Sequence, residues 1–233
     1  MPEAPPVATI RTQVTVPLRF ADGFATTARV STFNGLVDGR EHLAFALGDR
    51  ATTNARNTNA RNPNGRNPNG HGPVGGSVPL VRPHSECLTG DVFGSQRCDC
   101  GPQLREAVER IAAAGGYLLY LRQEGRGVGL YTKLDAYALQ DGGLDTYEAN
   151  LALGHREDER DYTVAGQMLG ALGVTRIALL SNNPDKAEQL SRLGVTVTGF
   201  VPTGVYRSPA NAEYLAAKAR HAAARTLGLP VLG

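Results

Sequence analysis

The chain contains only three cysteines, Cys87, Cys98 and Cys100, and they lie close together in the sequence. Three thiolates suit a soft, tetrahedrally coordinated cation such as zinc, and a fourth position left to water distinguishes a catalytic zinc site from a closed structural one. Thiolates that share one ion must converge on it, so this cluster constrains the fold more than any other feature. A metal-dependent hydrolase is therefore the first hypothesis.

Two other interpretations of the cysteines stay open. They could be ordinary buried thiols or half-paired disulfides, because free cysteine is a common core residue. A fourth protein ligand such as His84 would make the site structural, although His84 could equally contact a substrate. The odd number of cysteines argues against a secreted disulfide framework, and no signal-peptide pattern opens the chain. We therefore expect a cytoplasmic location, where reduced thiols can bind metal.

The length and the net charge of the chain limit the classes of protein to which it can belong. The 233 residues suffice for one large domain or two small ones, and 41% of them are hydrophobic, which is ample for a core. No uninterrupted apolar stretch approaches the length of a membrane span, so we expect no membrane partner. The 24 basic and 22 acidic residues nearly cancel, which does not indicate a nucleic-acid partner. Any affinity for anions must be local.

The pattern of apolar residues changes near Cys100. Before it, segments alternate in the manner of strands and predict an antiparallel meander; after it, helix and strand signals alternate. The predicted strands are 8–18, 24–33, 41–47, 77–82, 117–122, 176–181 and 195–201. The predicted helices are 103–114, 131–140, 162–172, 184–193 and an alanine-rich terminal helix at about 210–227. The sum is a mixed α/β (α+β) fold, with a strand-rich N-terminal half and a mixed sheet flanked by helices.

A low-complexity insert interrupts the chain at 54–76, where four pentads rich in asparagine, glycine and proline run from 54 to 73. The insert has almost nothing apolar to bury, so we expect a flexible loop. An anion-binding arm that uses Arg56, Arg61 and Arg66 is the alternative. The expected organisation has four parts: a β-rich part over 1–53, the insert, a core over 77–209 that carries the cysteines, and a C-terminal helix and tail over 210–233.

Two turns after predicted strands could bind phosphate. In the turn that begins at Glu124, glycines leave backbone N–H groups exposed, and Arg126 adds a charged donor. In Ser181-Asn-Asn-Pro-Asp-Lys, the proline suits the first turn of a helix, and Asn183 is the expected N-cap. Glycine-rich turns and capped helices are also common without a ligand. The charged run at 156–161 is ordinarily a solvated face at a helix N-terminus.

Six motifs occur in a fixed order along the chain. They are Arg82-Pro-His-Ser-Glu-Cys-Leu-Thr-Gly-Asp, Arg97-Cys-Asp-Cys-Gly-Pro-Gln-Leu, Arg122-Gln-Glu-Gly-Arg-Gly-Val-Gly-Leu, Ala136-Tyr-Ala-Leu-Gln-Asp, Asp158-Glu-Arg-Asp-Tyr and Ser181-Asn-Asn-Pro-Asp-Lys. Together, with compatible spacings from about 77 to 220, they resemble the GTP cyclohydrolase II family. The N-terminal strands are compatible with that family but carry no diagnostic motif.

The resemblance implies a single-domain enzyme that opens the guanine imidazole ring of GTP and releases formate and pyrophosphate. The product would be 2,5-diamino-6-ribosylamino-4(3H)-pyrimidinone 5′-phosphate, at the entry to riboflavin synthesis or a related specialised pathway. The resemblance implies one zinc ion per subunit, bound by the three cysteines and water, within a zinc- and GTP-binding core at 77–209. Zinc would lower the pKa of its water for attack on C8 and then on the formyl amide. It also implies Mg²⁺ with the triphosphate and a homodimer.

The resemblance further implies roles for individual residues. Asp158 is the expected proton acceptor, and Tyr137 is a catalytic tyrosine. The family assigns Arg160 as a nucleophile on the α-phosphorus, but a guanidinium with a pKa above about 12 is a poor nucleophile, so stabilising charge is the alternative role. The expected GTP contacts are Arg82, Pro83, His84, Ser85, Glu86, Gln103, Glu124, Gly125, Arg126, Thr146, Ser181 and Lys186.

Several positions depart from the family pattern. Pro83 replaces a small β-branched residue, Ser181 replaces the more frequent threonine, and Asp185 stands where a second lysine is common. The insert has no counterpart in the common pattern, and no dihydroxybutanone-phosphate synthase domain is fused upstream, so we expect a stand-alone enzyme. Alternatives are a relative that stops at a formamidopyrimidine product, one that acts on another nucleotide, and a non-catalytic zinc- and nucleotide-binding regulator.

Overall fold

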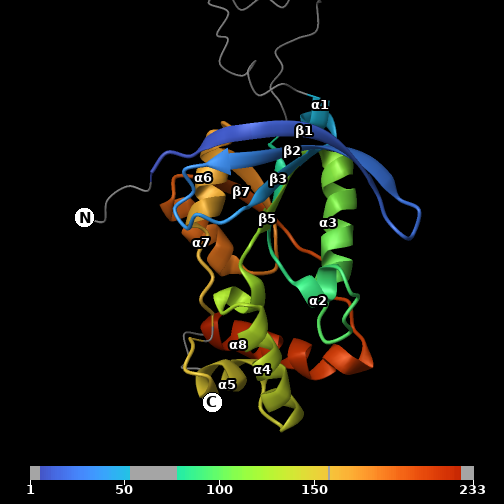
Figure 1. The fold of residues 1–233 in the computed structure, drawn as a ribbon, viewed down its shortest axis with the longest axis vertical. Helices are drawn as coiled ribbons and strands as arrows, with labels where there is room; N and C mark the ends of the chain where they lie inside the picture. The colour runs from blue at the N-terminus through green and yellow to red at the C-terminus, as the bar shows by residue number, and fades with distance from the viewer. Residues whose placement is uncertain (1–5, 53–77, 157, 227–233) are drawn as a thin grey trace, which may run out of the picture. The chain divides into compact units, whose positions relative to one another are not determined.

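The structure is a computed structural model that describes residues 6–52, 78–156 and 158–226 (Figure 1). The predicted insert at 54–76, with Arg56, Arg61 and Arg66, lies outside the described residues. Two compact units make up the chain, each assembled from three segments. The first unit comprises Met1–His84, Ala107–Leu121 and Tyr162–Thr203, and the second comprises Ser85–Glu106, Arg122–Asp161 and Gly204–Gly233.

A seven-stranded mixed sheet has the order β1-β2-β3-β5-β4-β6-β7. Its strands are β1 (Thr9–Arg19), β2 (Ala25–Asn34), β3 (Leu43–Leu47), β4 (Leu80–Ser85), β5 (Gly116–Leu121), β6 (Arg176–Leu180) and β7 (Thr196–Val201). The pairs β1–β2, β2–β3 and β3–β5 are antiparallel, whereas β4–β6 and β6–β7 are parallel. The predicted antiparallel meander and the mixed α/β class are therefore confirmed.

The hydrophobic core of the first unit lies between this sheet and two helices. Helix α6 (Thr163–Ala171) contacts β1 and β5, and α7 (Pro184–Arg192) contacts β7. Met168 on α6 and Leu190 on α7 are fully buried, as are Ile177 and Leu179 on β6. Burying side chains of this size contributes about 1.5–3 kcal/mol each, which anchors the helices to the central parallel strands.

Local sequence signals explain where α7 begins. The Asn183 side chain accepts a hydrogen bond from the Asp185 backbone N–H at 3.1 Å, which confirms the predicted N-cap. Pro184 occupies the first turn, where its missing N–H costs nothing. The start of α7 is thus fixed directly after β6, at the carboxyl end of a parallel strand.

The helices of the second unit include the shortest elements of the described chain. They are α2 (Leu88–Asp91), the start of α3 (Cys100–Ala114), the 3₁₀ helix η2 (Glu124–Gly127), α4 (Leu130–Asp141), α5 (Thr146–Ala152), the 3₁₀ helix η3 (Pro209–Asn211) and α8 (Ala212–Thr226). Figure 1 shows α4, α5 and α8 close together, and α5 contacts both of the others. None of the helices in the described ranges has the length and apolar character needed to cross a membrane.

Most predicted elements occur within two or three residues of their expected bounds. The short helices α2 and α5, and α1 (Asp49–Thr52) in the first unit, were not predicted. A helix of one or two turns is too short to show a 3.6-residue apolar period, so pattern analysis could not find α1 or α2. Helix α5 does carry a start signal, because Asp145 and Glu148 form a capping box.

Candidate active site

The three cysteines converge in the second unit. Cys87 directly precedes α2, Cys100 is the first residue of α3, and Cys98 lies two residues before that helix. Their sulfur atoms all lie within 4.8 Å of one another, and the cluster contains no fourth histidine, cysteine or carboxylate from the part of the chain described. The Cys87 and Cys98 side chains are buried. Such a compact set of thiol donors can bind a soft metal ion.

The short helix α2 leaves room for these sulfur atoms. A Cβ atom on Gly90 would lie 2.9 Å from the Cys98 Sγ and 3.0 Å from the Cys87 Sγ. The Asp91 carboxylate accepts a hydrogen bond from the Cys87 backbone N–H at 3.0 Å, which fixes the turn. The space between the sulfurs is therefore kept clear of side chains, as a metal centre requires.

Lys133 places a buried positive charge beside this cluster. Its Nζ donates hydrogen bonds to the Cys87 Sγ at 3.2 Å, the Thr89 Oγ1 at 2.9 Å and the Glu124 Oε1 at 2.9 Å. Only 9% of Lys133 is exposed to solvent. A buried ammonium is stable only when it is paired in this way. Lys133 therefore connects the cysteine cluster to Glu124, one of the predicted GTP contacts.

Hydrogen bonds and charge shift the pKa values of the three thiols in different directions. Hydrogen bonds from Cys100 and Cys98 lower the pKa of Cys87, and the Lys133 charge lowers it further. A hydrogen bond with Cys100 lowers the pKa of Cys98, but the hydrogen bond with Cys87 and burial outweigh it and raise this pKa to about 11. The hydrogen bond to Cys87 also raises the pKa of Cys100. One thiolate is thus favoured at Cys87, and binding a divalent cation would release protons from the other two.

Tyr137 lies four residues after Lys133, on the same face of α4. The Lys133 Nζ lies 5.8 Å from the centroid of the Tyr137 ring. Burial raises the pKa of Tyr137 to about 12, although Lys133 and a hydrogen bond with Thr89 act in the opposite direction. The Tyr137 phenol is therefore protonated at neutral pH and can donate a hydrogen bond.

Arg97 also contacts the Tyr137 ring. Its guanidinium carbon lies 4.4 Å from the ring centroid. Asp141 fixes that guanidinium through two hydrogen bonds, at 2.6 and 3.2 Å. The predicted catalytic tyrosine is thus oriented by a charged group that adjoins the cysteine motif in the sequence.

Glu124 and its neighbours form a tight turn after β5. The Glu124 Oε2 accepts a hydrogen bond from the Leu88 backbone N–H at 2.6 Å, and its Oε1 accepts one from the Gly125 N–H at 2.9 Å. Gly125 and Arg126 both have φ near +61°. Among the described residues, Arg126 is the only non-glycine residue with positive φ. This left-handed conformation disfavours an arginine and is tolerated where the surrounding contacts impose it.

Asp158 and Arg160 form an ion pair in the same unit. The Arg160 Nε donates to both Asp158 carboxylate oxygens, at 2.8 and 3.1 Å, and the Nη2 also donates to this carboxylate. Burial raises the pKa of Asp158, but the Arg160 hydrogen bonds outweigh it and, with the charge of Arg126, hold this pKa below its usual value. Asp158 is therefore ionised at neutral pH and can accept a proton.

The first unit gathers another group of predicted GTP contacts. Because β4 and β6 are parallel, their carboxyl ends lie at the same edge of the sheet. Arg82 and His84 lie on β4 and are buried, and the Arg82 Nε donates to the His84 Nδ1 at 3.4 Å. The His84 ring stacks on Tyr120 of β5 with 5.6 Å between ring centroids. His84 is thereby held in place within the sheet.

Lys186 and Ser181 lie at the same edge of the sheet, around the start of α7. The Lys186 Nζ donates to the Pro83 carbonyl oxygen at 2.7 Å and lies 5.4 Å from the Tyr162 ring centroid. The Ser181 Oγ accepts a hydrogen bond from the Asn183 N–H at 3.0 Å. The predicted contacts on β4 and α7 are thus neighbours in space, although they lie about a hundred positions apart in sequence.

The second unit contains four further predicted GTP contacts: Ser85, Glu86, Gln103 and Thr146. The Glu86 carboxylate accepts a hydrogen bond from the Arg122 Nε at 2.8 Å. The Gln103 Nε2 donates to the Asp99 Oδ2 at 2.7 Å. Thr146 is the first residue of α5. These roles in GTP binding remain predictions.

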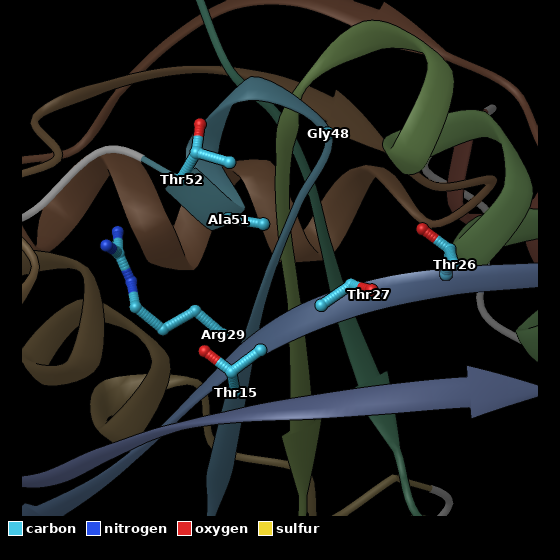
Figure 2. Close-up of a pocket in the computed structure, with 7 residues that line it drawn as sticks. All are labelled: Thr15, Thr26, Thr27, Arg29, Gly48, Ala51 and Thr52. Carbon is cyan, nitrogen blue, oxygen red and sulfur yellow. The ribbon is translucent and has the colours of Figure 1, made fainter.

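A separate polar hollow lies in the first unit, between the β1–β2 hairpin and α1 (Figure 2). Its lining residues are Thr15, Thr26, Thr27, Arg29, Gly48, Ala51 and Thr52. The Arg29 guanidinium donates to the Arg50 carbonyl oxygen at 2.8 Å. None of the predicted site residues lines this hollow, so it does not bear on the predicted reaction.

Sequence analysis did not identify four residues that contact predicted site residues: Arg97, Lys133, Tyr147 and Tyr214. Arg97 and Lys133 contact the Tyr137 ring, and the rings of Tyr147 and Tyr214 contact the Arg126 guanidinium. A signal existed for Lys133, because it precedes Tyr137 by one helical turn, and for Arg97, which adjoins Cys98. No signal existed for Tyr214, since its helical pattern gives no indication of what its ring contacts.

Comparisons with known proteins agree with the resemblance. The family model described as GTP cyclohydrolase II matches residues 11–202. A GTP cyclohydrolase-2 from Psychromonas ingrahamii is 43% identical over 213 residues, which cover 91% of this chain and 94% of that protein. A GTP cyclohydrolase-2 from Vibrio vulnificus is 46% identical over 194 residues, which cover 83% of this chain and 87% of that protein. The riboflavin biosynthesis protein RibBA of Bacillus subtilis is 47% identical over 206 residues, covering 88% of this chain and 45% of that protein. The chain belongs to the GTP cyclohydrolase II family.

Proposed function

We propose that this chain catalyses the GTP cyclohydrolase II reaction, the hydrolytic opening of the guanine imidazole ring of GTP with release of formate and pyrophosphate. One observation carries the proposal: the three cysteines, Lys133, Glu124 and Tyr137 form one connected polar cluster in a chain of this family. The cluster combines a metal-binding set of thiols with a proton donor and a carboxylate, which are the groups that a hydrolytic ring opening requires.

The cysteines would hold one zinc ion. Three converging sulfurs and the clear space at Gly90 fit a soft cation of this kind. When bound, zinc supplies a Lewis acid that lowers the pKa of water for hydrolysis. Magnesium is expected to accompany the triphosphate, because it prefers phosphate and carboxylate oxygens.

Tyr137 and Glu124 act on the base in this proposal. The Tyr137 phenol keeps its proton at neutral pH and can donate to the negative charge that develops as the imidazole ring opens. Lys133 orients the Glu124 carboxylate, whose remaining lone pair on Oε2 can accept a hydrogen bond from an N–H group of guanine.

Asp158, Arg160 and Arg126 act on the phosphate side. The ionised Asp158 carboxylate serves as the proton acceptor. Arg160, held by that carboxylate, stabilises charge on the α-phosphate, and this ion pair supports that role over nucleophilic attack by a protonated guanidinium. Arg126 contributes a further guanidinium for phosphate oxygens.

The remaining GTP contacts rest on the family resemblance. In the first unit these are Arg82, Pro83, His84, Ser181 and Lys186. In the second unit they are Ser85, Glu86, Gln103, Gly125 and Thr146. The cationic and hydroxyl side chains suit phosphate oxygens, whereas the amide and carboxylate side chains suit the edge of the base.

A homodimer in the cytoplasm completes the proposal, again on the resemblance. Sedimentation velocity of the purified protein gives the mass in solution directly. Twice the chain mass of 24.7 kDa is expected. A chain that stays monomeric at concentrations where it turns over GTP would contradict the dimer.

The direct test is incubation of zinc-loaded protein with GTP and magnesium, with formate, pyrophosphate and the nucleotide product followed by mass spectrometry. Formate and pyrophosphate in equal amounts to the product are expected. Ring opening without formate would identify an enzyme that stops at a formamide, and unchanged GTP would refute the proposal. The control is Cys98→Ser, which should remain folded but lose both zinc and turnover.

A further inference from the structure

The Arg126 guanidinium lies near two tyrosine rings. Its carbon is 4.2 Å from the centroid of the Tyr147 ring on α5 and 6.0 Å from that of the Tyr214 ring on α8. Both distances lie within the range in which an aromatic face attracts a guanidinium. All three residues belong to the second unit, and Figure 1 shows α5 and α8 close together. Two helices that are distant in sequence therefore hold one arginine side chain.

The rings account for the side chain's position without using its hydrogen-bonding capacity. The Arg126 Nη1 is buried and has no hydrogen-bond partner among the described residues. A buried N–H donor without an acceptor destabilises the folded state, so such a group indicates a missing acceptor. The strained backbone at φ +61° points the same way, because strain of this kind persists where the surroundings enforce a functional geometry.

Helix α8 lies beyond the part of the chain that the family model matches. That match ends at residue 202, and α8 spans Ala212–Thr226. An ion pair at 3.4 Å joins Arg220 of this helix to Asp145, the residue that caps α5. Tyr214 thus lies on an element beyond the residues that the family model matches.

We infer that Tyr147 and Tyr214 are positioning residues that hold the Arg126 guanidinium so that its Nη1 meets a phosphate oxyanion of the nucleotide, and that α8 thereby completes the phosphate subsite. The inference rests on the proposed function for the role of Arg126 as a GTP contact. A guanidinium that two rings already hold loses little conformational entropy when it binds a phosphate, whereas an unrestrained arginine side chain must be ordered first. The attraction of a guanidinium to an aromatic face depends on the ring, which phenylalanine keeps, so phenylalanine should replace either tyrosine.

The test uses zinc-loaded full-length protein and two probes, inorganic pyrophosphate and guanosine, with binding measured by calorimetry. Tyr147→Leu and Tyr214→Leu should each weaken pyrophosphate binding about three- to thirtyfold, the range expected for a partly desolvated cation–π contact. Guanosine affinity should stay unchanged. Tyr147→Phe and Tyr214→Phe should bind pyrophosphate as the unaltered protein does. The control is Tyr131→Leu, which removes a ring that is 83% exposed on α4 and should change neither affinity.

A double-substitution cycle separates positioning from a general loss of structure. In an Arg126→Ala background, Tyr214→Leu should produce no further loss of pyrophosphate affinity, because the rings act only through Arg126. With GTP as substrate, the leucine variants should raise KM with little change in kcat. Pyrophosphate affinity that is unchanged in both leucine variants, equal losses for guanosine, or an additive loss in the Arg126→Ala background would each overturn the inference.

The two proposals fail in distinguishable ways. If the unaltered protein releases no formate from GTP, the proposed reaction fails, yet the pyrophosphate comparison still decides whether the rings position Arg126. If GTP turnover is normal and the leucine variants bind pyrophosphate normally, the inference about α8 fails and the proposed reaction stands.

Discussion

Lys133 links three groups with different chemistry through one ammonium. It donates to a cysteine sulfur, a hydroxyl oxygen and a carboxylate oxygen, and it lies in a site with little solvent. In such surroundings each partner depends on the others, since removing one leaves a buried charge unpaired. At the residue scale, the state of the cysteines and the orientation of Glu124 are therefore set by the same side chain.

Replacing Lys133 with methionine should affect both groups. The side chain keeps its length but loses the charge, so Glu124 remains buried without its partner, which costs about 3–5 kcal/mol of folding stability. Zinc affinity should fall about 10- to 100-fold, the usual effect of losing an outer-shell partner. Competition with a chromogenic chelator measures the affinity, and urea unfolding measures the stability.

The control for Lys133→Met is Arg192→Met, which removes a cation whose side chain is 70% exposed. Its effect should stay within about 0.5 kcal/mol because exposed ion pairs contribute little. Zinc affinity in Lys133→Met equal to that of the unaltered protein would show that the hydrogen bond to Cys87 has no role in metal binding.

Asp158 should give the protein a specific response to acid. Its pKa in the folded protein lies below the ordinary value of 3.8, so its ion pair contributes stability that is complete above that value. This contribution is lost as the pH falls through the lower, folded-state pKa. The stability difference between the unaltered protein and Asp158→Asn should therefore be largest at neutral pH and should shrink as the solution is acidified below 3.8.

Urea unfolding of both proteins across this pH range checks the expectation. Asp135→Asn, at an exposed position on α4, serves as the matched control and should show no such narrowing. A difference between unaltered protein and Asp158→Asn that stays constant, or widens, on acidification would mean that the pairing with Arg160 does not stabilise the fold.

Residues whose role depends on their neighbours in the chain could be predicted from the sequence. Asn183 is an N-cap because of the residues directly after it, and the three cysteines form a cluster because their spacing allows it. The roles of Lys133 and Tyr214 depend on tertiary contacts, with partners up to 46 and about 88 positions away. Periodicity and propensity do not describe such contacts. Helical spacing does place Lys133 one turn before Tyr137, but nothing in the sequence indicates what the Tyr214 ring contacts.

At the scale of elements, the contact between α2 and the start of α3 determines the cysteine geometry. A Cβ atom on Gly101 would lie 2.4 Å from the Gly90 carbonyl oxygen, so the two helices approach at a pair of glycines. Apolar spacing predicts a helix that begins only at Gln103, three residues after the observed start at Cys100. Proline is in fact accepted in the first turn of a helix, and Gly101 is needed for the close approach.

Gly90→Ala should therefore damage the metal centre more than the fold. The added methyl group would lie between the sulfurs of Cys87 and Cys98, and relieving the overlap should cost about 1–3 kcal/mol. Zinc content, measured by mass spectrometry after dialysis, should fall well below one ion per chain. The control is Gly170→Ala on α6, where an added Cβ meets no atom within 4 Å. Full zinc content in Gly90→Ala would contradict the proposed placement of the ion.

At the scale of the whole molecule, the order of strands was the least predictable feature. The strand types were evident from apolar alternation, but β5 enters the sheet between β3 and β4, although β4 precedes it in the chain. Pairing partners are chosen by packing across the sheet, which a single sequence does not record. For the same reason, the sequence does not indicate that segments of the chain alternate between two compact units.

Zinc should stabilise the folded chain as a whole. A ligand that binds only the folded state adds about 2.7 kcal/mol at a free concentration of about 100 times its Kd. Thermal unfolding with zinc, and after chelation and dialysis, should show a higher Tm with the metal. Cys98→Ser should lose this difference. The same Tm with and without zinc in the unaltered protein would argue against a metal site built from these cysteines.

The alternation of segments between the two units also bears on how the protein is made. On the ribosome, the β1–β2 hairpin emerges early and pairs locally, whereas the parallel pairing of β4 with β6 must wait for residues about a hundred positions later. The cysteines leave the exit tunnel well before Gly204–Gly233, the segment that contributes α8 to their unit. On the two proposals above, a nascent chain therefore gains its metal ligands before the α8 segment that holds Arg126 has been synthesised.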